Sequence, residues 1–301
     1  MAVSGSVDFE LDVAEYVEEA FERCGLVVST GYDLRTAKRS LNLLFADWAN
    51  RGLNRWTIEQ VSLPLATDIA NYPAGILTMT VGASGSFTVG ETITGGTSGA
   101  TASITSVTSS TVIAITIPSG TFVASETITG GTSGATTTVT AAVDFTNVRS
   151  TIDILSAVIR ENAGASTQSD IAISRISRDT YINIPSKRQT ARPSQFYIDR
   201  QITPILKLWS TPDATTYTLV FDRLVRIDDA DNPQNTVDVP FRFYPCLAAG
   251  LAYYISLKKA PNRVQLLKAV YEEEFERAAA EDRDRASLTL TPSRDYYTLI
   301  R

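Results

Sequence analysis

One segment of eleven residues occurs twice without a change, and it restricts the middle of this chain to β-structure. Glu91–Thr101 reads ETITGGTSGAT and recurs as Glu126–Thr136, 35 residues further on. β-branched residues favour strands, and the Gly-Gly-Thr-Ser-Gly segments are typical of turns. We therefore predict an all-β module over residues 76–146, built from two related hairpin units of 35 residues each.

The residues before this module indicate two helices and a strand. Apolar residues recur at helical spacing in both helices; the first is predicted to stop at Gly25, and the second to begin with Asp33 as its N-cap. Apolar and polar residues then alternate over 61–65, which predicts a strand. Pro64 cannot donate to a ladder, so we expect this strand at a sheet edge.

After the module, four short strands and two helices are expected. Pro245 precedes one helical pattern, and Pro261 lies in the first turn of the other, where its missing N–H costs nothing. The predicted strands cover residues 181–184, 196–198, 205–209 and 217–221. A tail over residues 286–301 follows, and its Tyr296, Tyr297 and Ile300 fit either a frayed terminus or an arm that docks on a partner.

Composition excludes several classes of function. The 301 residues correspond to about two domains. They include no histidine, which excludes His-based general bases, His-paired nucleophiles and His-ligated metals. Cys24 and Cys246 are too few for a zinc site and are expected in the core. A net charge of −6 argues against a general nucleic-acid binder, and no segment is apolar enough for membrane insertion or a signal peptide.

The remaining candidates for chemistry are acidic residues. Glu91, Glu126 and Asp144 are formal candidates for acid/base work on glycosides, but the two glutamates occupy matching repeat positions. Matching positions indicate a shared structural role, such as bonding a turn amide. The acidic run at 228–231 departs from a calcium loop, because the required Gly and Glu are replaced by Gln234 and Pro240.

Several segments outside the module resemble one family in their order and spacing. The resemblance covers roughly residues 8–70 and 147–285. The segments that carry it are LRTAKRSLNLLFADWANRG at 34–52, LNRW at 53–56, IDIL at 152–155, ISRDTY at 176–181, RPSQFYIDR at 192–200, ILKLWSTP at 205–212, RIDD at 226–229, VPFR at 239–242 and LAAGLAYY at 247–254. The chain resembles the head-to-tail adaptor (tail accessory factor) family of short-tailed bacteriophages, the podoviruses.

This resemblance implies an α+β fold with a mainly α-helical adaptor body, residues 1–75 and 147–285, and a small β-region. It implies a structural protein of the virion tail, synthesised in the host cytoplasm, without catalytic activity, cofactor or metal. The implied partners are the portal protein, the tail nozzle, a tail fibre or spike, and eleven further copies in a ring of twelve. The ring extends the channel through which double-stranded DNA passes, and Tyr296, Tyr297 and Ile300 of the C-terminal arm reach the portal.

The module over residues 76–146 departs from the family pattern, and we expect it to be an insertion on the outside of the ring. Two other functions stay open from the sequence. One is a fibre-anchoring or host-surface adhesion protein that acts through the module. The other is a tail-associated cell-wall hydrolase that uses Glu91 and Glu126.

Overall fold

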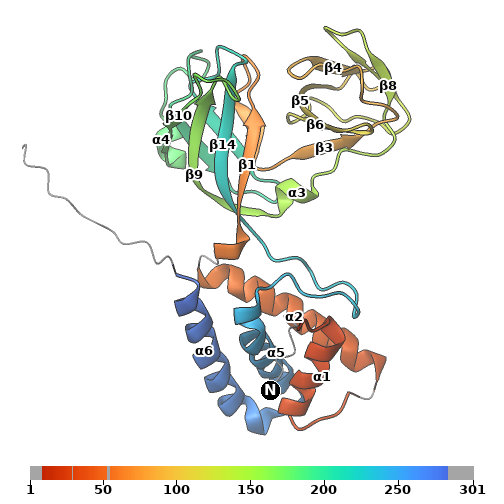
Figure 1. Ribbon diagram of the computed structural model, residues 1–301, viewed down its shortest axis with the longest axis vertical. Helices are drawn as coiled ribbons and strands as arrows, with labels where there is room; N and C mark the ends of the chain where they lie inside the picture. The colour runs from red at the N-terminus through yellow and green to blue at the C-terminus, as the bar shows by residue number, and fades with distance from the viewer. Residues whose placement is uncertain (1–8, 29, 53–54, 284–301) are drawn as a thin grey trace, which may run out of the picture. The chain divides into compact units, whose positions relative to one another are not determined.

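The computed structural model describes residues 9–28, 30–52 and 55–283 (Figure 1). The structure is about 31% helical and 30% strand. The chain divides into two compact units: Met1–Arg55 with Asp228–Arg301 is the helical unit, and Trp56–Ile227 is the strand unit. The helical unit is therefore made of two segments that are far apart in the sequence, and the strand unit is the continuous stretch between them.

In the described residues of the helical unit there are four α-helices, and α5 contacts each of the other three. The helix α5 is apolar on all sides, as expected for a helix surrounded by others. Its small residues Ala248, Ala249 and Gly250 allow close approach. The bounds are α1 Val13–Arg23, α2 Gly31–Arg51, α5 Tyr244–Lys259 and α6 Val264–Glu281, with 3-10 turns at Phe241–Phe243 and Pro261–Arg263.

Both N-terminal helices begin with a capping box. The carboxylate of Asp12 accepts from the N–H of Glu15 at the start of α1. At the start of α2, the hydroxyl of Thr30 accepts from the N–H of Asp33. The N-cap of α2 is therefore Thr30 rather than Asp33, which instead bonds back to the N–H of Thr30. The predicted stop at Gly25 is confirmed, since α1 ends just before it and its φ is +70°.

Buried aromatic residues join α2 to α6. The indole N–H of Trp48 donates to the hydroxyl of Tyr271 at 3.0 Å, and that hydroxyl donates to Asp47 at 3.1 Å. Both rings are fully buried. Arg51 lies 4.8 Å from the Tyr271 ring centroid and pairs with Glu272 at 2.6 Å. The polar atoms of Trp48 and Tyr271 are thereby satisfied although both rings are buried.

Two four-stranded sheets of the strand unit pack face to face around one apolar cluster. Alternation along the strands explains this burial: in β12, Phe196 and Ile198 point inward while Tyr197 points outward. Pro64 lies in β1, at the sheet edge where it was predicted. The first sheet is β1 Ile58–Pro64, β14 Tyr217–Val225, β9 Thr151–Glu161 and β10 Ser169–Ala172; the second is β11 Ser174–Arg175, β12 Gln195–Asp199, β13 Ile205–Trp209 and β2 Asn71–Pro73.

The repeat region forms a third sheet with its own apolar cluster. Each copy of the repeat makes a hairpin, β4 with β5 and β7 with β8, as predicted. The antiparallel pairing of β4 with β7 joins the two copies. In sheet order the strands are β3 Leu77–Thr80, β6 Val112–Ile115, β5 Thr101–Ser109, β4 Thr92–Gly95, β7 Thr127–Gly130 and β8 Thr136–Thr138, and the short helix α3 Thr146–Arg149 follows.

The expectation of a mainly α-helical body is wrong. Outside the third sheet, eight strands still form two complete sheets in the described residues. The helical expectation came from the resemblance, whereas the period-two burial of β12 and β13 is what the residues themselves encode. One local prediction also failed: part of the strand expected at 181–184 belongs to the helix α4, Arg178–Ile182, because Ser177 caps the N–H of Thr180.

We predict that Gly250→Ala destabilises the helical unit. An added Cβ would lie 2.9 Å from both Leu44 Cδ2 and Tyr271 Cε2, in a fully buried site. Overpacking costs about 1–3 kcal/mol, which exceeds the gain of about 1 kcal/mol from replacing a helical glycine. Urea unfolding should show the loss. Gly31→Ala is the matched control, since no atom lies within 4 Å of its Cβ; an equal loss there would contradict the packing argument.

Candidate functional site

The two repeat glutamates are buried structural acceptors, each serving the turn of the other repeat. Glu91 accepts from the N–H groups of Thr132 and Ser133 at 3.3 and 3.0 Å, and from the Ser133 hydroxyl at 2.8 Å. Glu126 accepts from Thr97 and Ser98 at 3.3 and 2.9 Å, and from the Ser98 hydroxyl at 2.9 Å. Their predicted role of bonding turn amides is confirmed. That each glutamate bonds the turn of the other repeat was not predicted from the sequence.

Each carboxylate also closes its own turn, and glycines make room for it. Glu91 accepts from the N–H of Thr88, and Glu126 from that of Val123, both at 2.6 Å. A Cβ on Gly130 would lie 2.5 Å from Glu91 Oε2, and one on Gly95 would lie 2.7 Å from Glu126 Oε2. Glycine at these two repeat positions therefore permits the close approach that the hydrogen bonds require.

The hydrogen bonds determine the protonation of these groups. Burial alone would raise the pKa of Glu91, but the N–H groups of Ser133 and Thr88 outweigh it and hold the pKa below its ordinary value. The pKa of Glu126 is lowered in the same way by Ser98 and Val123. A glycosidase general acid needs the opposite shift. The pKa of Asp144 is also lowered, first by its side-chain hydrogen bond with Thr146, next to α3.

We predict that Glu91→Gln and Glu126→Gln each loosen the third sheet. The amide would turn an N–H group toward backbone donors, at a cost of about 1–3 kcal/mol. The folded carboxyls have pKa values below 4.5, so their contribution is complete above that pH and is lost as the pH falls through the folded pKa.

Hydrogen exchange of peptides covering residues 91–138 measures both effects. Protection factors, which remove the intrinsic pH dependence of amide exchange, should fall in each variant at neutral pH and in the wild type as the pH falls through the folded carboxyl pKa, with the variants less sensitive to the acid step. Glu276→Gln, an exposed residue on α6, is the control. Unchanged protection in both repeat variants would show that the carboxylates do not hold the turns.

The cysteines and the acidic run do not form reactive or metal sites in the described part of the chain. Cys24 and Cys246 are both buried, as predicted, and burial raises the pKa of the Cys246 thiol to about 12. Asp231 accepts from the side-chain amide of Asn235 at 2.9 Å in a surface turn. Among the residues described, no group of three or more acidic or cysteine side chains could hold a metal ion.

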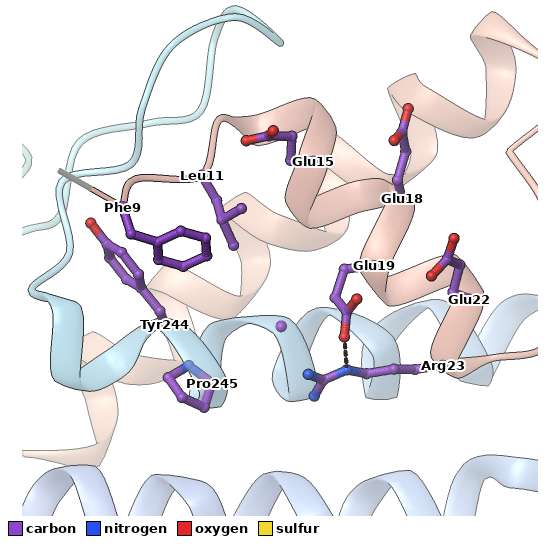
Figure 2. A pocket seen from close by; sticks show the side chains of 10 residues that line it. Phe9, Leu11, Glu15, Glu18, Glu19, Glu22, Arg23, Tyr244 and Pro245 are labelled. Atoms are coloured by element: carbon purple, nitrogen blue, oxygen red, sulfur yellow. Dashed lines mark hydrogen bonds and ion pairs between the residues drawn. The ribbon is translucent and has the colours of Figure 1, made fainter. Parts of the chain in front are cut away.

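An apolar hollow with a glutamate-rich rim lies on the helical unit, and we call it the acidic groove. It holds about 430 Å³ between α1 and the start of α5. Figure 2 shows Phe9, Leu11 and Tyr244 together at one end, while the carboxylates of Glu18 and Glu22 extend from α1 at the other. The groove is lined by Phe9, Leu11, Glu15, Glu18, Glu19, Glu22, Arg23, Tyr244, Pro245 and Ala248.

A cationic surface lies on the outer face of the second sheet in the strand unit. Between Arg175 and Lys207 the chain carries seven Lys or Arg and two Asp, although the whole chain is acidic. At its centre the Tyr181 ring from α4 stacks on Tyr197 from β12, with centroids 5.6 Å apart. Lys207 lies opposite Tyr197 on β13, with its ammonium 5.9 Å from the Tyr181 centroid.

Two hollows flank this stacked pair. One, of about 390 Å³, is lined by Arg175, Arg178 and Arg200 beside Tyr197. The other, of about 580 Å³, is lined by Lys187 and Arg188 beside Tyr181. We call the whole surface the basic patch, consisting of Arg175, Arg178, Tyr181, Lys187, Arg188, Tyr197 and Arg200.

Sequence reasoning missed both surfaces. The glutamates of α1 occupy the faces that its apolar residues leave, as in any amphipathic helix, and the basic residues of 175–207 are spread over a helix, a loop and two strands. Counting the charge of each segment would have revealed the patch, because residues 175–207 carry seven Lys or Arg and two Asp. The predicted portal-binding residues Tyr296, Tyr297 and Ile300 lie outside the described residues. In the described part, no helix has the length and apolar character needed to cross a bilayer.

Comparison with known proteins identifies the family. No curated protein matches the chain. A family model described as SU10 adaptor protein matches residues 100–295, well over half of the chain. The matched range runs from β5 to beyond α6, so it includes part of the repeat region, the strands of the paired sheets other than β1 and β2, and the helices α5 and α6. This agrees with the resemblance to phage head-to-tail adaptors, and the chain belongs to the SU10 adaptor protein family.

Proposed function

We propose that this protein is a head-to-tail adaptor that forms a ring of twelve copies below the portal of a phage virion. The ring extends the DNA channel and attaches the tail nozzle and the fibres or spikes. The observation that carries the proposal is the match to the adaptor family over residues 100–295. The geometry supports a structural role, because the buried carboxylates are occupied by turn amides while the exposed features are surfaces suited to docking.

The proposed contact with the portal uses the C-terminal arm, residues 286–301, with Tyr296, Tyr297 and Ile300 as anchors. Tyrosine contributes large contact area at low entropic cost, and a few such residues dominate the energy of most interfaces. An overall charge of −6 also suits a channel wall, since phosphates bind where cations neutralise them.

We predict that the full chain adds twelve copies to its cognate portal ring, and that a chain ending at Arg285 binds at least about tenfold more weakly. Native mass spectrometry counts the copies, and titration gives the affinity. Tyr296→Ala/Tyr297→Ala/Ile300→Ala should reproduce the truncation. Undiminished binding by the truncated chain would refute the arm, and absence of wild-type binding would refute the adaptor role.

Residues 76–146 are proposed as an inserted module. A buried arginine supports this, because it joins the two ends of the segment. Arg223 of β14 donates to the carbonyl of Asn147 at 2.6 Å, to the Thr151 hydroxyl at 3.0 Å and to Glu59 at 2.7 Å. The side chain of Asn147 in turn accepts from the N–H of Ile76 at 2.8 Å. Segments whose ends lie close together are the ones a fold tolerates as insertions.

We predict that replacing residues 77–145 by a short Gly-Ser linker leaves the remaining chain folded and able to join the portal. The paired sheets keep their own apolar cluster, and the linker spans ends that are already adjacent. Circular dichroism, urea unfolding and portal binding are the measurements. A shortened chain that folds but no longer joins the ring would instead favour the fibre-anchoring or adhesion role of the module.

A further inference from the structure

We propose that the acidic groove of one copy binds the basic patch of a neighbouring copy, so that one repeated head-to-tail contact closes the ring. This inference deepens the proposed ring by naming the two faces that meet. The groove belongs to the helical unit and the patch to the strand unit, so the two faces are separate surfaces of the chain.

Uncompensated charge is the first argument. Glu18 and Glu22 are exposed and have no ion pair within the described residues, whereas the adjacent Glu19 pairs with Arg23 at 2.7 Å. The same contrast holds in the basic patch, again for the part of the chain the structure describes. Arg178 and Arg188 are exposed and unpaired, whereas Arg175 pairs with Asp153 at 2.9 Å. Each face therefore offers charges that are free to meet a partner.

Apolar and aromatic content is the second argument. Phe9 is 63% exposed in the groove, beside Leu11 and Tyr244 (Figure 2). A second hollow shares Glu18 and Glu22 and includes Val27, which is 84% exposed. The patch presents stacked tyrosines between two hollows lined by arginine. Tyrosine and arginine are the residues most enriched at the energetic centres of interfaces.

A ring of more than two copies requires the contact to be head to tail. A two-fold contact that paired groove with patch twice would use both faces of both copies and stop at a dimer. A heterologous contact uses one face of each copy, keeps opposite charges together and propagates from copy to copy, so it closes a ring when the rotation permits. A phosphate backbone would satisfy the basic patch, but it would leave the free glutamates of the groove without a cationic partner.

Charge reversal of each face separately tests the pairing. The variants are Glu18→Lys/Glu22→Lys and Arg178→Glu/Arg188→Glu, both in the full chain, with Glu273→Lys/Glu276→Lys on α6 as the matched control. Sedimentation velocity over a range of concentrations measures association, with and without the portal ring. Each face variant alone should associate about tenfold more weakly than the wild type, and the control should be unchanged.

Mixing the two face variants is the decisive measurement. In the mixture the native groove of one variant meets the native patch of the other, and the reversed groove meets the reversed patch, so the two variants should regain assembly as alternating copies. A variant carrying all four reversals should regain assembly, because both faces then change sign together. Wild-type and mixed complexes should weaken between 0.1 and 1 M salt, where the Debye length falls from about 10 to about 3 Å. Rescue in the mixture also shows that each variant is folded.

Several outcomes would overturn the inference. These are a mixture that stays monomeric while the wild type associates, face variants that associate like the wild type, a control that is equally impaired, and a wild type whose copies never associate. The last outcome is separate from portal binding, which tests the adaptor role by itself. If Arg178→Glu/Arg188→Glu loses binding to a short DNA duplex but keeps its self-association, the basic patch is a nucleic-acid surface and the proposed pairing is wrong.

Discussion

The strand unit depends on one buried cation. Arg223 is 2% exposed, and its guanidinium bonds Glu59 on β1, Thr151 on β9 and the carbonyl of Asn147. A buried charge destabilises the fold unless it is paired and hydrogen-bonded, so removing one of these partners would leave the buried guanidinium partly uncompensated. The guanidinium of Arg223 also lies where the chain leaves the paired sheets at Gly75 and returns to them at Asn147. A Cβ on Gly75 would lie 2.6 Å from its Nη1, so the chain can pass this point only without a side chain.

In the repeat region, each repeat supplies a buried glutamate to the turn of the other repeat. The backbone pairing of β4 with β7 joins the two copies in one sheet. Because Glu91 holds the turn at Ser133 and Glu126 holds the turn at Ser98, side-chain hydrogen bonds join the same two copies a second time. The occupied carboxylates also explain why this region offers acceptors for structure rather than an acid/base pair for hydrolysis.

The functional reading rests on surfaces rather than on a catalytic centre. The shifted pKa values have structural causes. Burial raises the pKa of the Cys246 thiol, and hydrogen bonds from turn amides lower the pKa values of Glu91 and Glu126. In the described part of the chain, Glu18 and Glu22 of the acidic groove and Arg178 and Arg188 of the basic patch are exposed and have no ion pair. Those are the groups that an assembly of many copies can use, and they agree with membership of an adaptor family.

Local sequence determined much of the fold. The exact repeat predicted two hairpins, the alternation around Tyr197 and Leu208 predicted strands, and Pro64 predicted an edge. These features follow from short-range sterics and periodicity, which a sequence displays directly. The resemblance suggested a mainly helical body and was misleading, because strand content is set by those local patterns. The helix at Arg178–Ile182 was missed because the Ser177 cap outweighed a short β-like run.

Tertiary structure decided the relations between distant residues. Sequence identified Glu91 and Glu126 as structural acceptors but could not show that each serves the other repeat, because register between hairpins depends on which strands pair. It also could not assemble the basic patch, whose members are brought together by the packing of α4 on β12 and the pairing of β12 with β13. The alternation of apolar and polar residues is a local property, so it can be read directly from the sequence. Charge complementarity between surfaces arises only after the chain has folded.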